Sequence, residues 1–454
     1  MKVRFVLAAL IAMVAGSTFA APRNIGINVL LNTHVTDALV AHLSQYGRVG
    51  NKLLSIDAVT MSIDPSQLDA IRALPYVAAA NPDAERTGAP VDTVSVTDFT
   101  GGLSTWDNDA INVTHFGMFG RAVPYDGTGV YVAVIDTGLL DSWRKYFPQE
   151  RIATQFAKAF SGGGGLNGRV SEPTNKWEHD QNSHGTHVTS TILGYSLNGV
   201  PINGVAPGAT VIPVKVLNQN GSGWSSVVAR GIEYVADLKN SGALGGAPVV
   251  INMSLGGPAL DAVEKAAVDY AVSSGVIIVA AAGNEGTAGM GYPGAYQPVI
   301  SVAAAGWVGQ WSPAGNNAWW FNRDVPDPTD AGQFYIADFS SRQLAGQDLD
   351  VAAPGVWVVG PYQANSGNRT SYFLLSGTSM ASPHVAGIAA LMMQKDPALT
   401  QGAVETLLEG AATPMAAGCA NVRQPSTAVT QVCWGADAVG SGFITADAAL
   451  AATP

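Results

Sequence analysis

The sequence predicts an α/β protein, in which a doubly wound, mainly parallel sheet is preceded by a smaller α+β unit. Two observations predict this fold class. Beyond residue 104, near-continuous apolar runs alternate with segments of helical spacing, an order typical of parallel sheets with helices on both faces. Before residue 84, strand-like segments alternate with two helix-like ones, as in split βαβ (ferredoxin-like) folds. The length of 454 residues also indicates two or three folding units.

The larger unit is expected to span residues 105–454. Its apolar runs suit strands that are buried on both faces. These runs are VYVAVI (130–135), TVIPVKVL (210–217), PVVINMS (248–254), GVIIVAAA (275–282) and PVISVAAA (298–305). Residues 225–240 and 261–275 have helical spacing and end at Asn or Gly. Residues 306–347, rich in tryptophan and aspartate, are interpreted as a surface insertion, with a substrate-contacting flap or an ion site as the alternative.

The smaller unit is expected to span residues 21–83. Apolar alternation and flanking turn residues define its elements. Strands are predicted over 23–31, 58–64 and 76–83, and helices over 35–47 and 65–75. Residues 84–104 lack periodicity and contain Pro, Gly and Thr, so they are interpreted as a linker.

The N-terminus has the pattern of a signal peptide over residues 1–20. Lys2 and Arg4 precede an apolar run over 5–14 and small residues at 18–20. A membrane anchor is the alternative, but the run is shorter than the roughly 20 residues that span a bilayer. Export in turn favours a disulfide between Cys419 and Cys433, 14 positions apart, over a metal or redox site or two unpaired thiols.

Charge excludes one class of partner. The formal net charge is −11 and no cluster of Lys and Arg is present, whereas binding to nucleic acid phosphates needs such a cluster.

Asp136 and His184 are candidate catalytic residues. Asp136 directly follows a predicted buried strand in VAVIDTG, where the carboxylate is well placed to serve a site. The alternative is an aspartate that caps a turn. The Asp-Thr-Gly of an aspartic protease needs a second copy, and the chain has none. His184, in NSHGTHV, is either a general base or a packed histidine. A zinc pair with His187 lacks the His-Glu-x-x-His pattern and a third ligand.

Ser379 lies in LSGTSMASPHVAG, at the start of a predicted helix. Gly377 lets another backbone approach closely, and the free N–H groups of the helix start point at this turn. A serine hydroxyl becomes a nucleophile when a neighbouring base takes its proton. The alternative is a small-residue helix start that packs against the sheet.

Asp, His and Ser in this chain order form the arrangement of subtilisin. VAVIDTG, HGTHV and GTSMASPHVAG each resemble signatures of the subtilisin-like serine proteases, and GVAPGATVIPVKVL, VINMSLGG, AAGNEG and YPGAY follow in the family's order. The resemblance covers the chain from about residue 105. It implies a subtilisin-like fold and a serine endopeptidase that works through an acyl-enzyme. Asp136 would orient the histidine, His184 would be the general base and then acid, and Ser379 would be the nucleophile.

The resemblance also implies the residues that bind the substrate. Asn284 matches the oxyanion-hole asparagine and would act together with the Ser379 N–H. Gly221, Ser222 and Gly223 match one edge that binds an extended substrate, and Ser254, Leu255 and Gly256 match the other. Gly283 and Gly291 would line an open first specificity pocket for a large apolar or aromatic side chain, and Glu285 near its mouth would admit Lys or Arg.

The resemblance further implies that residues 21–83 are an inhibitory propeptide, removed by self-cleavage within 84–104. The chemistry would need no cofactor, and the structural calcium that family members often bind would lie at Asn198 with Asp141. The expected partners are protein or peptide substrates and the protein's own propeptide, with no nucleic acid and no membrane after export. The expected product is a secreted monomer, extracellular or in transit through the periplasm.

Two other classes of function share this fold and triad: a silent binding module and an esterase or transferase. A catalytically silent binding module would be expected to lose a triad residue or the asparagine, and none is lost. An esterase or transferase would need a pocket for a non-peptide substrate, which the two intact peptide-binding edges argue against.

Overall fold

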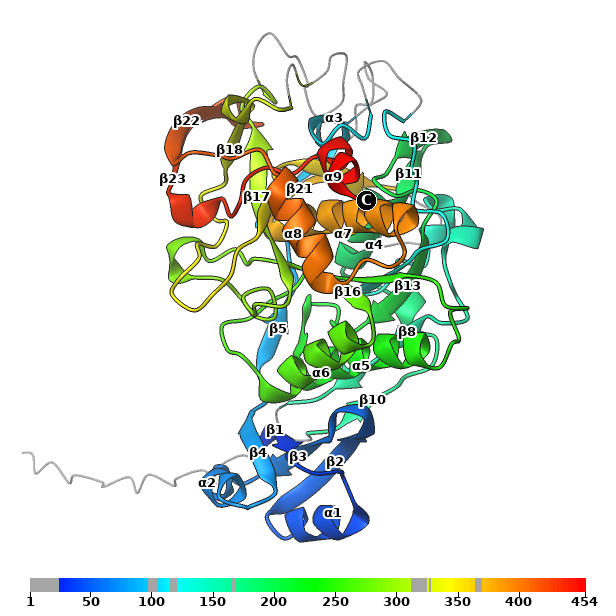
Figure 1. Ribbon diagram of the computed structural model, residues 1–454, viewed down its shortest axis with the longest axis vertical. Helices are drawn as coiled ribbons and strands as arrows, with labels where there is room; N and C mark the ends of the chain where they lie inside the picture. The colour runs from blue at the N-terminus through cyan, green and yellow to red at the C-terminus, as the bar shows by residue number, and fades with distance from the viewer. Residues whose placement is uncertain are drawn as a thin grey trace, which may run out of the picture.

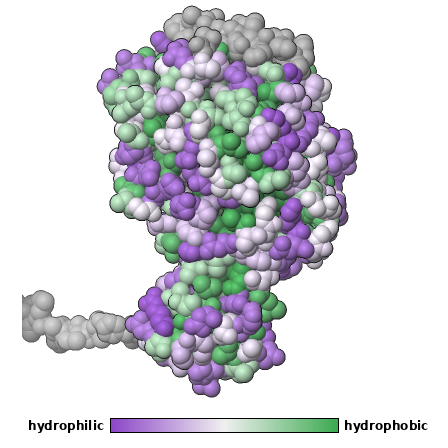
Figure 2. Space-filling model, in the orientation of Figure 1, coloured by the Kyte–Doolittle hydropathy of each residue, from purple (hydrophilic) through white to green (hydrophobic). Residues whose placement is uncertain are grey.

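The computed structural model describes residues 24–96, 105–114, 121–164, 168–311, 325, 328–363 and 370–454. The predicted signal segment over 1–20 lies outside the described residues, as do parts of the linker and of the insertion, with Trp319 and Trp320. The small unit lies below the larger one in Figure 1, beneath helices α5 and α6. Figure 2 shows it as a separate lobe that a narrower waist joins to the larger one.

The larger unit is built on one sheet with the strand order β18-β17-β16-β15-β7-β13-β8, and β19 also pairs with β17. All neighbours pair in parallel except β17 with β18. The strands are β7 (Tyr131–Asp136), β8 (Lys158–Ala159), β13 (Thr210–Lys215), β15 (Val249–Met253), β16 (Val276–Ala281), β17 (Ile300–Trp307), β18 (Phe334–Ile336) and β19 (Val351–Pro354). The predicted fold class of a doubly wound, mainly parallel sheet is confirmed, with a strand at each of the five apolar runs.

Helices cover both faces of this sheet. On β7, Val132 and Val134 belong to the core beneath α4 and α7, whereas Ala133 and Ile135 belong to the core beneath α5 and α6. Burial on both faces is the reason why the strands have no polar alternation. The helices are α3 (Trp106–Ala110), α4 (His184–Leu193), α5 (Ser225–Asn240), α6 (Ala262–Ser273), α7 (Thr378–Lys395), α8 (Gln401–Ala411) and α9 (Ala446–Ala452).

Short strands at the edges complete the larger unit. They are β9 (Ser161–Gly162) with β10 (Val170–Ser171), β11 (Gly194–Leu197) with β12 (Val200–Asn203), β20 (Val358–Pro361) with β21 (Tyr372–Ser376), β22 (Gly418–Arg423) with β23 (Val429–Trp434), and β14 (Ser222–Trp224). Within the predicted insertion, β18 adds an antiparallel strand to the sheet edge, and the Trp307 side chain is buried in the core. In the described part of the chain, no helix has the length and apolarity needed to cross a bilayer.

The small unit is a four-stranded antiparallel sheet, ordered β2-β3-β1-β4, with two helices. Its elements are β1 (Ile25–Leu31), α1 (Asp37–Leu43), β2 (Gly47–Leu53), β3 (Ala58–Ile63), α2 (Leu68–Arg72) and β4 (Val77–Pro82). Ile27 and Val29 pack with both helices in the unit's own core. Leu30, which has the opposite orientation on β1, packs into the core of the larger unit beneath α5 and α6.

The sequence did not predict β2. The predicted helix over 35–47 ends at Leu43, and Gly47 begins a strand instead of ending the helix. This strand is polar and contains glycine, so its local pattern gives no strand signal. A Cβ on Gly50 would lie 2.1 Å from the Gly168 carbonyl oxygen, and this close approach between the units explains the glycine.

The described part of the predicted linker forms two strands. β5 (Glu85–Thr87) pairs with β14, and β6 (Asp92–Val96) pairs with β21, both antiparallel. Figure 1 shows β5 rising from the small unit into the larger one. Each strand of this segment is therefore held by the larger unit rather than by its own sequence.

Candidate active site

Asp136, His184 and Ser379 lie at the ends of three elements. Asp136 is the last residue of β7, His184 the first residue of α4, and Ser379 the second residue of α7. The His184 Nδ1 atom lies 2.9 and 3.0 Å from the two Asp136 carboxylate oxygens. Both side chains are buried. The carboxylate fixes the tautomer that leaves Nε2 as the proton acceptor.

A second layer of residues holds Asp136 in place. The Thr137 N–H donates to Asp136 Oδ1 at 2.6 Å. The Thr137 hydroxyl donates to Asp180 at 2.8 Å and accepts from the Gly185 N–H at 2.8 Å. Burial raises the pKa of Asp180 to about 6. Sequence reasoning missed Asp180, although it stands only four residues before His184, just upstream of NSHGTHV.

Ser379 hydrogen-bonds reciprocally with Ser254 rather than with His184. The Ser379 hydroxyl donates to the Ser254 carbonyl at 3.1 Å, and the Ser254 hydroxyl donates to the Ser379 carbonyl at 2.8 Å. Within the described chain, His184 Nε2 is buried and has no hydrogen-bond partner. A free, buried acceptor next to the cleft is what a general base needs, and in free enzymes catalytic hydrogen bonds often form only with substrate.

Asn284 follows β16 and turns its amide group toward the cleft. Its Oδ1 atom accepts from the Thr378 N–H and from the Thr378 hydroxyl, both at 2.9 Å. Because the oxygen is occupied in this way, the Nδ2 group is left to donate. Such a donor beside the nucleophile suits the stabilisation of an oxyanion.

A cavity of about 210 Å³ opens beside Ser379. The predicted pocket residues Gly283 and Gly291 line it, together with Leu255 and Gly256 from the second edge. A Cβ on Gly283 would lie 2.5 Å from the Glu285 carboxylate and 2.8 Å from the Ser341 hydroxyl, so a larger residue would close the pocket. Glu285 also lines the cavity and accepts a hydrogen bond from Ser341 at 3.1 Å.

The chain's own residues 85–91 occupy the cleft between the two predicted edges. The Thr87 N–H donates to the Gly256 carbonyl and the Gly256 N–H to the Thr87 carbonyl, both at 2.9 Å. On the other edge, Thr87 pairs with Ser222, and the Gly88 N–H donates to the Gly221 carbonyl at 2.8 Å. This is strand addition, in which main-chain hydrogen bonds hold an extended peptide.

The same segment continues past Ser379. The Val91 N–H donates to the Ser376 carbonyl at 2.7 Å, and β6 then pairs along β21. Ala89 lines the cavity beside Ser379. Residues 89–91 therefore run along the same cavity as Ser379.

Asn198 and Asp141, the predicted calcium ligands, share no hydrogen-bond partner in the described structure. Asp141 pairs with His179 at 2.8 Å, and Asn198 is a turn residue with a φ of 50° between β11 and β12. His187, the other half of the excluded zinc pair, points its Nε2 at the Val358 carbonyl at 3.1 Å, and burial lowers its pKa to about 3.

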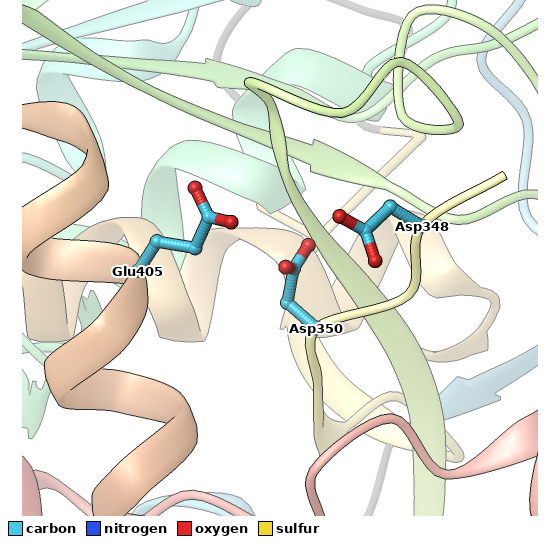
Figure 3. Close-up of side chains that lie close together, drawn as sticks. All are labelled: Asp348, Asp350 and Glu405. Atoms are coloured by element: carbon cyan, nitrogen blue, oxygen red, sulfur yellow. The ribbon is translucent and has the colours of Figure 1, made fainter.

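Three carboxylates gather elsewhere, at Asp348, Asp350 and Glu405 (Figure 3). Asp350 Oδ2 accepts from the Ser301 N–H at 2.6 Å, and among the described residues its Oδ1 is buried without a partner. Burial raises the pKa of Asp350 to about 7, and burial with nearby carboxylates raises that of Glu405 to about 7. Oxygen donors of this kind suit a hard cation such as calcium, and none of them touches the triad.

Cys419 and Cys433 lie directly opposite each other on β22 and β23. Their sulfur atoms are 2.09 Å apart, the separation of a bonded pair.

Fold and site together define an α/β serine hydrolase with a peptide-binding cleft. The model of the subtilase family matches residues 127–435, and the chain belongs to this family. Family members are serine endopeptidases whose catalysis needs no cofactor and whose substrates are proteins, and this chain is such an enzyme. The predicted family and enzyme class are confirmed.

Curated relatives match between 64% and 82% of this chain. Subtilisin DY of Bacillus licheniformis is 37% identical over 297 residues, which cover 64% of this chain and 87% of that protein. Subtilisin E of Bacillus subtilis is 38% identical over 293 residues, 64% of this chain and 62% of that protein, so the match spans less than two thirds of that relative. M-protease of Shouchella clausii is 32% identical over 378 residues, 82% of this chain and 80% of that protein.

Solved structures share the fold. Fervidolysin from Fervidobacterium pennivorans, described as a keratinolytic enzyme related to subtilisin, aligns over 94% of this chain and 61% of its own, with a TM-score of 0.63 and 24% identity. Sphericase aligns over 77% of this chain and 99% of its own, with a TM-score of 0.53 and 28% identity.

Proposed function

We propose that this protein is a secreted serine endopeptidase made as a self-processing zymogen, with Asp136, His184 and Ser379 as its triad. One observation carries the proposal: the chain's own residues 85–91 run through the cleft beside Ser379, with β5 (Glu85–Thr87) paired on both edges and main-chain hydrogen bonds continuing at Gly88 and Val91. The position of this strand is the one that a peptide substrate would take.

The geometry supports an acyl-enzyme mechanism. Ser379 Oγ attacks the substrate carbonyl carbon while His184 Nε2 takes its proton, and Asp136 stabilises the imidazolium that forms. The Ser379 N–H and the Asn284 amide would donate to the oxyanion. When the intermediate collapses, the C–N bond breaks and His184 protonates the leaving amine. Water then attacks the acyl-enzyme with His184 again as base, which releases the acid and restores Ser379.

In this proposal, residues 21–83 are the inhibitor that places the strand in the cleft. Asp83 supports this role, because its carboxylate accepts from the Ser226 N–H at 2.9 Å, the Ser225 hydroxyl at 2.8 Å and the Gly164 N–H at 2.5 Å. The hydrogen bond from the Ser226 N–H caps the start of α5, because the N-cap residue of this helix makes no side-chain hydrogen bond of its own. Self-cleavage would fall within 84–104, and the segment held in the cleft, residues 85–91, lies in that range.

Export is supported by two features. The pattern of residues 1–20 is that of a signal peptide. A disulfide between Cys419 and Cys433 would suit an oxidising compartment. We therefore propose a secreted enzyme that reaches the medium directly or through the periplasm.

Intact-mass and N-terminal mapping of the exported chain tests self-processing. Wild type should lose the small unit at a bond within 84–104, and Ser379→Ala should keep it. Ser382→Ala is the matched control, since this serine lies on the same helix and bonds to Asn252 at 2.7 Å. If Ser379→Ala is trimmed like wild type, self-processing is refuted. If wild type is also inactive on a denatured protein, the triad proposal fails.

A further inference from the structure

We propose that Glu264 makes one substrate subsite selective for a basic side chain, with Arg preferred. The subsite takes the residue three positions before the one that enters the pocket beside Ser379. In the chain's own segment these two residues are Arg86 and Ala89. This inference rests on the proposed protease function and names the class of sequence that the enzyme would prefer.

Arg86 is fully enclosed and its guanidinium is satisfied on several sides. Its Nε lies 3.0 Å from Glu264 Oε1, and its Nη2 lies 2.5 Å from Oε2, a two-pronged pair with the carboxylate. Nη2 also donates to the Ala259 carbonyl at 2.9 Å, and Nη1 donates to the Glu85 carbonyl at 2.9 Å. The exposed fractions of the Arg86 and Glu264 side chains are 0% and 1%. A planar fork with several donors fits this arrangement, and an apolar side chain would leave the carboxylate unpaired.

Glu264 lies in the first turn of α6 and belongs to the larger unit. Two further carboxylates, of Asp83 and Asp261, are close enough to add to the negative potential around Arg86. A buried carboxylate without a counter-charge is costly. Once Arg86 leaves with the small unit, the subsite therefore favours a substrate that brings a new cation to Glu264.

A substrate would place its side chain in this subsite through the same main-chain pairing that holds β5 in the cleft. Arg86 lies on β5, whose main chain pairs with β14 as any extended substrate would. Thr87, Ala89 and Val91 line the cavity beside Ser379. Because successive side chains of an extended segment point to opposite sides, Arg86 points away from this cavity and toward α6. The walls of the subsite belong to the larger unit: the Ala259 carbonyl and Gly257, where a Cβ would lie 2.9 Å from the Arg86 guanidinium.

The test uses the full chain after its own processing. Its substrates are two chromogenic peptides, the p-nitroanilides of Arg-Thr-Gly-Ala and Leu-Thr-Gly-Ala. Wild type should cleave the Arg peptide with a kcat/KM about 100-fold higher, because a subsite built to hydrogen-bond its ligand rejects an analogue without those groups. Glu264→Gln should lower kcat/KM for the Arg peptide by about tenfold or more and leave that for the Leu peptide nearly unchanged. Asp269→Asn is the control, an exposed acid on the same helix that pairs with Lys265, and it should keep the wild-type ratio.

Each result separates the subsite from the activity. If wild type cleaves both peptides equally, or if Glu264→Gln lowers both alike, the subsite inference is overturned while the protease stands. If wild type cleaves neither peptide and no protein, the proposed function itself fails. If Glu264→Gln does not fold around a buried Arg86, the double variant Arg86→Leu with Glu264→Leu replaces the pair by apolar groups. That variant should prefer the Leu peptide, and a retained preference for Arg would overturn the inference.

Discussion

Replacing Asp83 by Ala should open the cleft by loosening the small unit. Asp83 is buried between the units, and its two carboxylate oxygens accept from five donors, on Asn28, Gly164, Ser225 and Ser226. Alanine would leave the first turn of α5 without its cap and several buried donors without acceptors.

The magnitude follows from these contacts. A lost helix cap costs about 1 kcal/mol, and hydrogen bonds to a charged group are worth about 1.5–3 kcal/mol each, although they do not add. Burial raises the pKa of Asp83, because desolvation penalises its charged form and so offsets part of the gain. A net loss of about 3 kcal/mol corresponds to roughly a 100-fold larger undocked fraction.

Trypsin can report this fraction, because it cleaves after Arg and Arg86 is inaccessible in the docked state. In the inactive Ser379→Ala chain, the rate of cleavage at Arg86 tracks the open population when reclosing is fast. Asp83→Ala should raise this rate about 100-fold, measured by mass spectrometry over time. Asp69→Ala, which removes an exposed acid paired with Arg72 on the same unit, should not. Equal rates for the two variants would refute the reasoning.

Further predictions concern stability and catalysis. Burial raises the pKa of Asp350 to about 7. Between about pH 4 and 7 the native state therefore keeps the Asp350 carboxyl protonated while the unfolded state does not, and the native state loses stability as pH rises through that window. In the Ser379→Ala chain with divalent cations chelated, Asp350→Asn should therefore raise the free energy of unfolding by about 1–4 kcal/mol at pH 8 and by much less at pH 4. Urea melts at the two pH values measure this, and an equal gain at both would contradict it. Asn284→Ala should lower kcat about 10²–10³-fold with little change in KM, and a change in KM alone would argue against the oxyanion role. Replacing Cys419 and Cys433 by Ser should cost about 3 kcal/mol, and a melting temperature insensitive to reductant in the parent chain would show that the pair is not bonded.

Local patterns accounted for the main sheet and the motifs. The apolar runs predicted the five strands because a strand buried on both faces is apolar along its whole length, whichever strands it pairs with. Residues 225–240 coincide with α5, whose spacing and end are set within the segment. Asp136, His184 and Ser379 could be identified because their surrounding motifs are local, and the structure brings Asp136 and His184 to 2.9 Å.

The sequence by itself thus determined the fold class, the family and the candidate triad. Only the tertiary structure decided that residues 85–87 and 92–96 are strands, since β5 and β6 exist through pairing with β14 and β21 and have little apolar pattern of their own. It also decided that Arg86 meets Glu264 and that Asp83 caps α5, contacts between residues 178 and 143 positions apart. Such contacts depend on how two separately folded units dock, and no periodicity along the chain records that geometry.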